Sequence, residues 1–230
     1  MSVQLRILSA GAVKPGLMRV IDEFQSEMGA KATASFATAP SIRKRITDGE
    51  ALDILVAPPS VIDEMVNDGK ISTLEAVILG RIGVGVMVRD DSWLPPITSV
   101  AEFKEALLAA ESVVYNRAST GIYLETLFDR LDVGDAVKTK SIRYPDFAEV
   151  LDHICKGNGR ELGLGATTVI IENQSRGVKF VGPLPPEIQN YTAYAAAIVT
   201  GSDTKEATQQ FIRYLSSPQA RALLSAAGIQ

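Results

Sequence analysis

The sequence has very little sulfur and imidazole chemistry, with one cysteine, Cys155, and one histidine, His153, in 230 residues. A single cysteine cannot form an internal disulfide, which excludes a disulfide-stabilised scaffold. Two soft ligands are too few for a structural zinc site, and a spacing of two residues places them on different sides of the helix expected there. We therefore expect no metal site, and we expect Cys155 to be a small apolar residue, not a nucleophile.

Long apolar runs and an excess of positive charge are also missing. No run approaches the roughly 20 apolar residues of a membrane helix, and the start of the chain, MSVQLRILSAGAV, lacks the pattern of a secretory leader. There are 23 Lys and Arg against 27 Asp and Glu, a formal net charge of -4. This balance argues against nucleic acid or an anionic membrane as the partner. We expect no membrane insertion, and a cytoplasmic location as written or a periplasmic one if a leader was removed.

Glycine is common, but not in a pattern that binds nucleotides. The segments GRIGVG and GNGRELGLG match neither a dinucleotide fingerprint nor a P-loop with its lysine. Turns and close packing explain such glycines, so we expect no nucleotide cofactor and no other cofactor.

The periodicity of the apolar residues predicts an α/β protein. The run Leu5–Leu8 indicates a buried strand, and apolar residues then recur every three or four positions up to Met28, which indicates a helix ending at Gly29. Two more strand and helix pairs complete a βαβαβα arrangement over residues 5–69. This order is typical of a parallel sheet covered by helices.

The rhythm changes near Gly80, and a second lobe is expected. The segment RIGVGVMV (81–88) predicts β structure, a proline-containing loop follows, and a further series of strands and helices begins. The segment YTAYAAAIV (191–199) predicts another strand, and two helices close the chain.

Small and polar residues occupy three junctions where a strand leads into a helix. Ligands of open parallel sheets lie beyond the carboxyl ends of the strands, where helix starts present free N–H groups. Small residues let the backbone approach a ligand, and hydroxyls add donors, so such junctions suit a small anion. The candidate ligand-binding residues at these junctions are Ser9, Gly11, Ala12, Ala39, Pro40, Ser41, Arg117, Ser119, Thr120 and Tyr123.

Two of these residues have simpler alternative roles. Ser9 would serve only as the cap of the following helix. Arg117 has a planar fork that can bind a carboxylate with two hydrogen bonds, but it would equally form an ion pair with Glu125 or Asp129. The sequence leaves both alternatives open.

Four segments in order resemble one known family. They are LSAGAVKPGLMRVIDEFQSEMG, SIRKRITDGEALDILVAPP, STGIYLETLFDRL and FIRYLSSPQARALLSAAGI, and together they resemble the molybdate-binding family of type II periplasmic solute-binding proteins. The resemblance implies a two-lobed type II periplasmic-binding-protein fold, with mixed sheets flanked by helices and a ligand cleft between the lobes. It implies lobe 1 from residues 1–82 and 196–230, lobe 2 from residues 83–195, and two crossover strands.

The sequence departs from this family at the positions that contact the ligand. The serine of the first loop falls here on Gly11, the paired serines of the second loop become Ala39 and Pro40, with Ser41 one place later, and the ligand-contacting tyrosine falls on Ala166. A tetrahedral oxyanion needs a ring of such donors. We therefore expect a small organic carboxylate as the ligand instead of molybdate.

Three functions remain open on this basis. The first is a solute-binding protein for a small-molecule anion, for which a transporter partner stays uncertain. The second is a cofactor-free isomerase of a small unsaturated carboxylate, similar to the few proteins resembling this family that isomerise aconitate. This reaction needs a base beside the ligand, and none is evident in the sequence. The third is a cytoplasmic ligand sensor.

Overall fold

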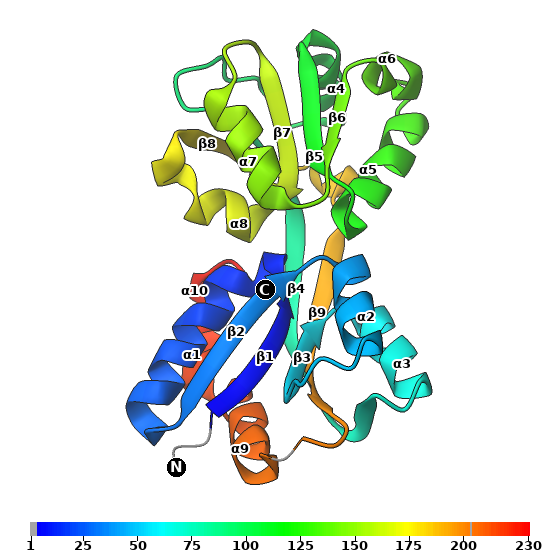
Figure 1. Ribbon diagram of the computed structural model, residues 1–230. Helices are drawn as coiled ribbons and strands as arrows, with labels where there is room; N and C mark the ends of the chain where they lie inside the picture. Colours follow the sequence, from blue (N-terminus) through cyan, green and yellow to red (C-terminus); the bar gives the residue numbers. More distant parts are fainter. Residues whose placement is uncertain (1–3, 203) are drawn as a thin grey trace. The chain divides into compact units, whose positions relative to one another are not determined.

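The chain folds into two compact units. The computed structural model describes residues 4–202 and 204–230 (Figure 1), and residues 1–3 of the expected N-terminal lobe lie outside this part. Unit 1 comprises the chain up to Ile82 together with residues from Ala193 onward, and unit 2 comprises Gly83–Thr192. The long strand β4 (Ile71–Arg89) and the strand β9 (Tyr191–Val199) each contain one of the two boundaries. The lobe limits and the cleft expected from the sequence stay predictions.

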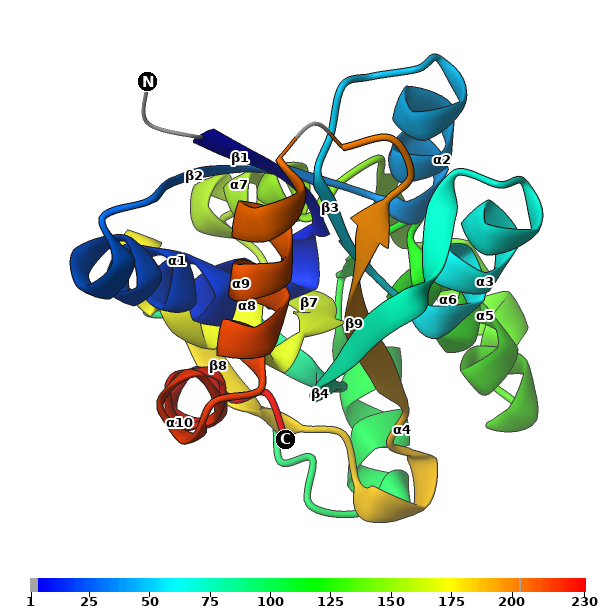
Figure 2. The same ribbon diagram turned by 90° about the horizontal axis from the view of Figure 1, so that it is seen from below.

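Unit 1 is built on a mixed sheet in the order β2-β1-β3-β9-β4. Strand β1 is parallel to both β2 and β3, and β9 is antiparallel to β3. Helices α1, α9 and α10 pack together on one side of these strands, and α2 and α3 lie on the other (Figure 2). Besides β4 and β9, the elements of unit 1 are β1 (Gln4–Ala10), the 3-10 helix η1 (Gly11–Val13), α1 (Lys14–Met28), β2 (Lys31–Ala37), α2 (Ala39–Thr47), β3 (Ile54–Ala57), α3 (Pro59–Asn67), α9 (Lys205–Leu215) and α10 (Pro218–Ala226).

Unit 2 has its own mixed sheet, in the order β8-β4-β7-β5-β6. Strand β5 is parallel to β6 and β7, whereas β4 is antiparallel to β7 and β8. Helix α7 covers one face of this sheet, and α5 with α6 and α4 covers the other (Figure 1). The elements are α4 (Val100–Ala109), β5 (Ser112–Asn116), α5 (Ser119–Arg130), α6 (Gly134–Lys138), β6 (Ser141–Tyr144), α7 (Phe147–Lys156), β7 (Glu161–Ala166), α8 (Thr167–Glu172), η2 (Gln174–Arg176), β8 (Val178–Pro183) and η3 (Pro186–Ile188).

The predicted α/β class, with mixed sheets flanked by helices, is confirmed. Strands β1, β2 and β3 form the predicted parallel arrangement, and Gly29 ends α1 with a left-handed φ of 65°. The structure adds β8, which the sequence reading missed, and it extends β4 back to Ile71, ahead of the predicted segment 81–88. Among the described helices, none is long and apolar enough to cross a membrane.

Candidate functional site

The first two candidate loops lie side by side, at the carboxyl ends of two neighbouring strands of the unit 1 sheet. Strands β1 and β2 are parallel and paired in register, and their last residues, Ala10 and Ala37, are partners. The loop with Gly11 and Ala12 and the loop with Thr38 therefore leave the sheet at neighbouring points. The structure thus brings together the unit 1 candidates, which are Ser9, Gly11, Ala12, Ala39, Pro40 and Ser41.

The hydroxyl of Ser9 does not cap a helix. Ser9 is fully buried, and its Oγ donates to the carbonyl oxygen of Ala10 at 3.1 Å. Neither η1 nor α1 has a side-chain cap at its start. The alternative that Ser9 serves as the helix cap is therefore wrong.

The start of α2 is also without a side-chain cap. Thr38 is its N-cap residue, with an extended backbone, but its hydroxyl accepts no bond from the helix. The first intrahelical bond runs from the N–H of Ile42 to the carbonyl of Thr38 at 2.8 Å. Because Pro40 has no N–H, the first turn leaves the amides of Ala39 and Ser41 for another acceptor. Pro40 and Ser41 are exposed.

The third candidate loop connects β5 to α5 in unit 2. The N–H of Arg117 donates to the carbonyl of Tyr144 at 2.9 Å, which ties the loop to β6. The N–H of Ala118 donates to Oδ1 of Asn116 at 3.3 Å, and α5 has no side-chain cap. Ser119 is exposed and Thr120 is half-buried in the first turn. Three other helices, α4, α7 and α10, do have side-chain caps at their N-termini. The helices that follow the candidate loops, α1, α2 and α5, differ from them in having none.

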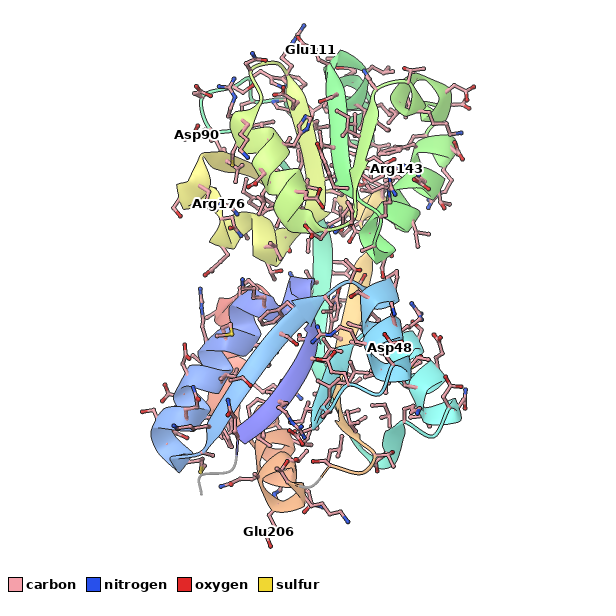
Figure 3. All side chains as sticks on the ribbon, viewed as in Figure 1. Asp48, Asp90, Glu111, Arg143, Arg176 and Glu206 are labelled. Atoms are coloured by element: carbon pink, nitrogen blue, oxygen red, sulfur yellow. The ribbon has the colours of Figure 1, made fainter. Side chains whose placement is uncertain are left out.

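Arg117 lines a hollow of about 340 Å³ on unit 2. The other lining residues are Gly121, Ile122, Glu125 and Arg143. Arg143 lies on β6 beside α5 and forms an ion pair with Glu125 (Figure 3). Among the described residues, the guanidinium of Arg117 has no hydrogen-bonding or ionic partner.

The two ion pairs suggested for Arg117 are not formed. Glu125 is bound to Arg143, and Asp129 accepts from Lys138 Nζ at 3.2 Å. Arg117 therefore keeps its charge and its donors available on an exposed side chain.

Tyr123 is engaged within unit 2. Its hydroxyl donates to the carbonyl oxygen of Ile188 at 2.6 Å, and its ring packs against the hydrophobic core of this unit. Burial raises the pKa of Tyr123. These contacts give Tyr123 a structural role, and its role as a ligand-binding residue stays a prediction.

Two cations near the candidate loops were missed by the sequence reading. Arg143 comes into the hollow because β6 pairs with β5, which sequence periodicity does not reveal. Lys14 begins α1 three residues after Gly11, and its Nζ lies 5.5 Å from the ring centroid of Phe36 on β2. Its position only three residues after Gly11 in the sequence is the signal by which Lys14 could have been identified.

His153 and Cys155 are held in local contacts on α7. The ring Nδ1 of His153 lies 3.0 Å from the hydroxyl of Tyr144. Burial raises the pKa of the Cys155 thiol, which disfavours the reactive thiolate. The expectation that neither residue is a nucleophile or metal ligand stays a prediction.

Comparison with known proteins establishes the family. The family of bacterial extracellular solute-binding proteins matches residues 5–230, and the chain belongs to this family. The resemblance to molybdate-binding type II solute-binding proteins is confirmed. The family description gives no support to the cytoplasmic location expected from the sequence.

Individual relatives show which proteins the chain is similar to. An aconitate isomerase from Pseudomonas sp. is 26% identical over 234 residues, which cover 98% of this chain and 87% of that protein. The periplasmic molybdate-binding protein of Azotobacter vinelandii matches the fold with a TM-score of 0.82 at 16% identity, covering 98% of each chain. The sulfate-binding protein SubI of Mycobacterium tuberculosis gives a TM-score of 0.79 at 16% identity, covering 99% of this chain and 86% of that one.

Proposed function

We propose that this solute-binding protein holds a small organic carboxylate, with Arg117 as its main charged contact. The candidate ligand-binding segments remain the loops Ser9–Ala12 and Thr38–Ser41 of unit 1 and the loop Asn116–Gly121 of unit 2. The observation that carries this proposal is the guanidinium of Arg117, which lines a hollow and lacks a partner among the described residues. A guanidinium fork binds a planar carboxylate with two parallel hydrogen bonds.

The chemistry of the unit 1 loops supports an organic anion over a tetrahedral oxyanion. Gly11, Ala39 and Pro40 stand where the resembling molybdate binders carry serines, and the hydroxyl of Ser9 is bound to the backbone. Backbone amides at the start of α2 remain as donors. Amides at helix starts bind a carboxylate well, whereas a compact oxyanion requires donors around its whole surface.

Replacing Arg117 with glutamine is expected to weaken carboxylate binding about 10-fold to 100-fold, because a hydrogen bond to a charged group contributes about 1.5 to 3 kcal/mol. Binding of small mono-, di- and tricarboxylates is measured by calorimetric titration, or by proton NMR line broadening for weak ligands. The matched control is Arg213→Gln, which removes an exposed arginine from α9. Equal affinities in both variants would contradict the role of Arg117.

Gly11→Ser is expected to leave the fold intact and to increase affinity for molybdate or sulfate about 10-fold. A Cβ at Gly11 meets no atom within 4 Å, so the serine fits without displacing its neighbours. Its hydroxyl supplies one of the donors that the resembling family has at this position, and one such bond to an anion is worth about 1.5 kcal/mol or more. Calorimetry with sodium molybdate measures the gain.

The control for this substitution is Gly182→Ser, where a Cβ also has ordinary contacts, at 3.5 Å from Ile97. We interpret the lack of serine hydroxyls in these loops as the reason why molybdate is not the ligand. This interpretation is wrong if Gly11→Ser folds normally and binds molybdate no better than the unmodified protein does.

A second candidate is an isomerase of a small unsaturated carboxylate. It is favoured by the similarity to an aconitate isomerase, which covers 98% of this chain. Such a reaction removes a proton next to a carboxylate, so it needs a base and donors for the developing negative charge. Ser41, Ser119 and Thr120 are the candidate hydroxyl donors, because the hydroxyl of Ser9 already donates to the backbone.

Proton NMR in heavy water separates binding from catalysis. The protein is mixed with cis-aconitate or trans-aconitate, and spectra are recorded over time. Broadened ligand signals without conversion support the binding protein. New product signals, or solvent deuterium at an acidic carbon, would establish the isomerase and replace our first proposal.

A further inference from the structure

The hollow around Arg117 holds more than one charge. Arg117 and Arg143 contribute two guanidinium groups, and Glu125 contributes one carboxylate. All three come from elements of unit 2, because Arg117 follows β5, Glu125 lies on α5 and Arg143 lies on β6. The lining therefore has a net charge of one positive unit, which a single carboxylate neutralises.

Glu125 determines which of the two arginines is available. Its Oε1 accepts from Nη1 of Arg143, and 48% of the Arg143 side chain and 43% of the Glu125 side chain are exposed. Arg117 has no comparable partner among the described residues. One guanidinium of the hollow is thus free, while the other is already neutralised.

We propose that Glu125 is a specificity-determining residue that limits this hollow to one carboxylate group of the ligand. This inference rests on the proposed function, because it takes Arg117 as the contact for that carboxylate. A second carboxylate entering the hollow would find Arg143 occupied and would be repelled by the charge of Glu125. The side chain of Ile122, which is 65% exposed, offers an apolar surface to the carbon part of the ligand.

The test compares two small probes, propionate with one carboxylate and malonate with two. The measured quantity is the ratio of the malonate affinity to the propionate affinity, determined by proton NMR titration of the full-length protein. In Glu125→Gln the negative charge is removed and Arg143 is released, so the ratio is expected to rise about 10-fold. In the double variant Glu125→Gln/Arg143→Gln the ratio is expected to return to that of the unmodified protein.

The matched control is Asp129→Asn. Asp129 lies on the same helix as Glu125 and accepts from Lys138 at 3.2 Å, so this variant loses the same charge from a similar exposed ion pair. The ratio should stay unchanged in this control. An equal rise in Asp129→Asn would show a general charge effect and would overturn the role of Glu125.

The two proposals fail in different ways. If Arg117→Gln binds propionate as well as the unmodified protein does, the proposed carboxylate site is wrong. If Arg117→Gln loses propionate binding but Glu125→Gln leaves the affinity ratio unchanged, the site stands and only the specificity role of Glu125 is overturned.

Discussion

Gly121→Ala is expected to destabilise unit 2 by about 3 kcal/mol, at the upper end of the usual cost of overpacking. A Cβ at position 121 would lie 1.8 Å from the carbonyl oxygen of Asn116 and 3.2 Å from the ring of Tyr115. The obstacle is backbone at the end of β5, so it cannot turn aside as a flexible side chain would. Alanine normally favours a helix over glycine, so a loss of stability would come from this contact alone.

The single tryptophan makes this prediction measurable. Trp93 lies in unit 2 and packs against its hydrophobic core, so its fluorescence during urea unfolding reports on this unit. The matched control is Gly182→Ala in the same unit, where the nearest atom to a Cβ is at an ordinary 3.5 Å. The close approach of α5 to β5 would be refuted if both variants unfolded at the same urea concentration.

The same substitution is expected to weaken ligand binding without touching a ligand. Gly121 and Arg117 both line the hollow, and they are joined by the short turn after β5. If α5 must shift to admit a methyl group, the guanidinium moves with the turn. Small displacements of a binding group cause large losses because directional hydrogen bonds tolerate little misalignment.

Much of the architecture could be predicted from local sequence. The spacing of apolar residues reveals α1 and its end at Gly29, since one helical face must be buried and a left-handed terminal residue favours glycine. The loops after β1 and β2 could also be identified, because small residues interrupt the apolar pattern of each strand before the next helix begins.

The charges of the hollow could not be found in this way. Glu125 and Arg143 are 18 residues apart and lie on a helix and a strand. They meet because β5 and β6 pair in parallel, with Tyr115 opposite Arg143. Pairing of strands is a tertiary property, and the short pattern SIRY carries no signal for its neighbour. The hydrogen bond from the Ser9 hydroxyl to the carbonyl of Ala10 could not be predicted from the sequence either.

The second large effect is expected at Asp53 in unit 1. This residue joins β1 to β3 at the start of the two strands, opposite the end from which the candidate loop after β1 leaves. Its side chain is fully buried and accepts from the N–H of Arg6 at 2.8 Å and from its Nε at 3.0 Å. The hydroxyls of Ser202 and Thr204 also donate to it, at 2.8 and 3.0 Å. Burial by itself would raise the pKa of Asp53, but these hydrogen bonds outweigh it and lower the pKa from 3.8 to about 2.

Asp53→Asn is therefore expected to destabilise unit 1 by about 2 kcal/mol at pH 7, because the asparagine imitates the protonated acid and a pKa difference of nearly two units corresponds to this free energy. The folded state holds the proton more weakly than the unfolded state does. The stabilisation is thus complete above pH 4 and is lost as the pH falls through about 2. The difference between the two proteins should shrink over this range.

Urea unfolding followed by far-UV circular dichroism between pH 7 and pH 2 measures this difference, and Trp93 fluorescence monitors unit 2 in the same samples. The control is Asp48→Asn, which removes an exposed carboxylate bound to Lys44 at 2.7 Å and should cost less than about 0.5 kcal/mol. A difference that stays constant down to pH 2 would mean that the charge of Asp53 is not what stabilises unit 1. A difference that vanishes would show that the buried carboxylate ties β1, the turn before β3 and the segment after β9 together through its charge.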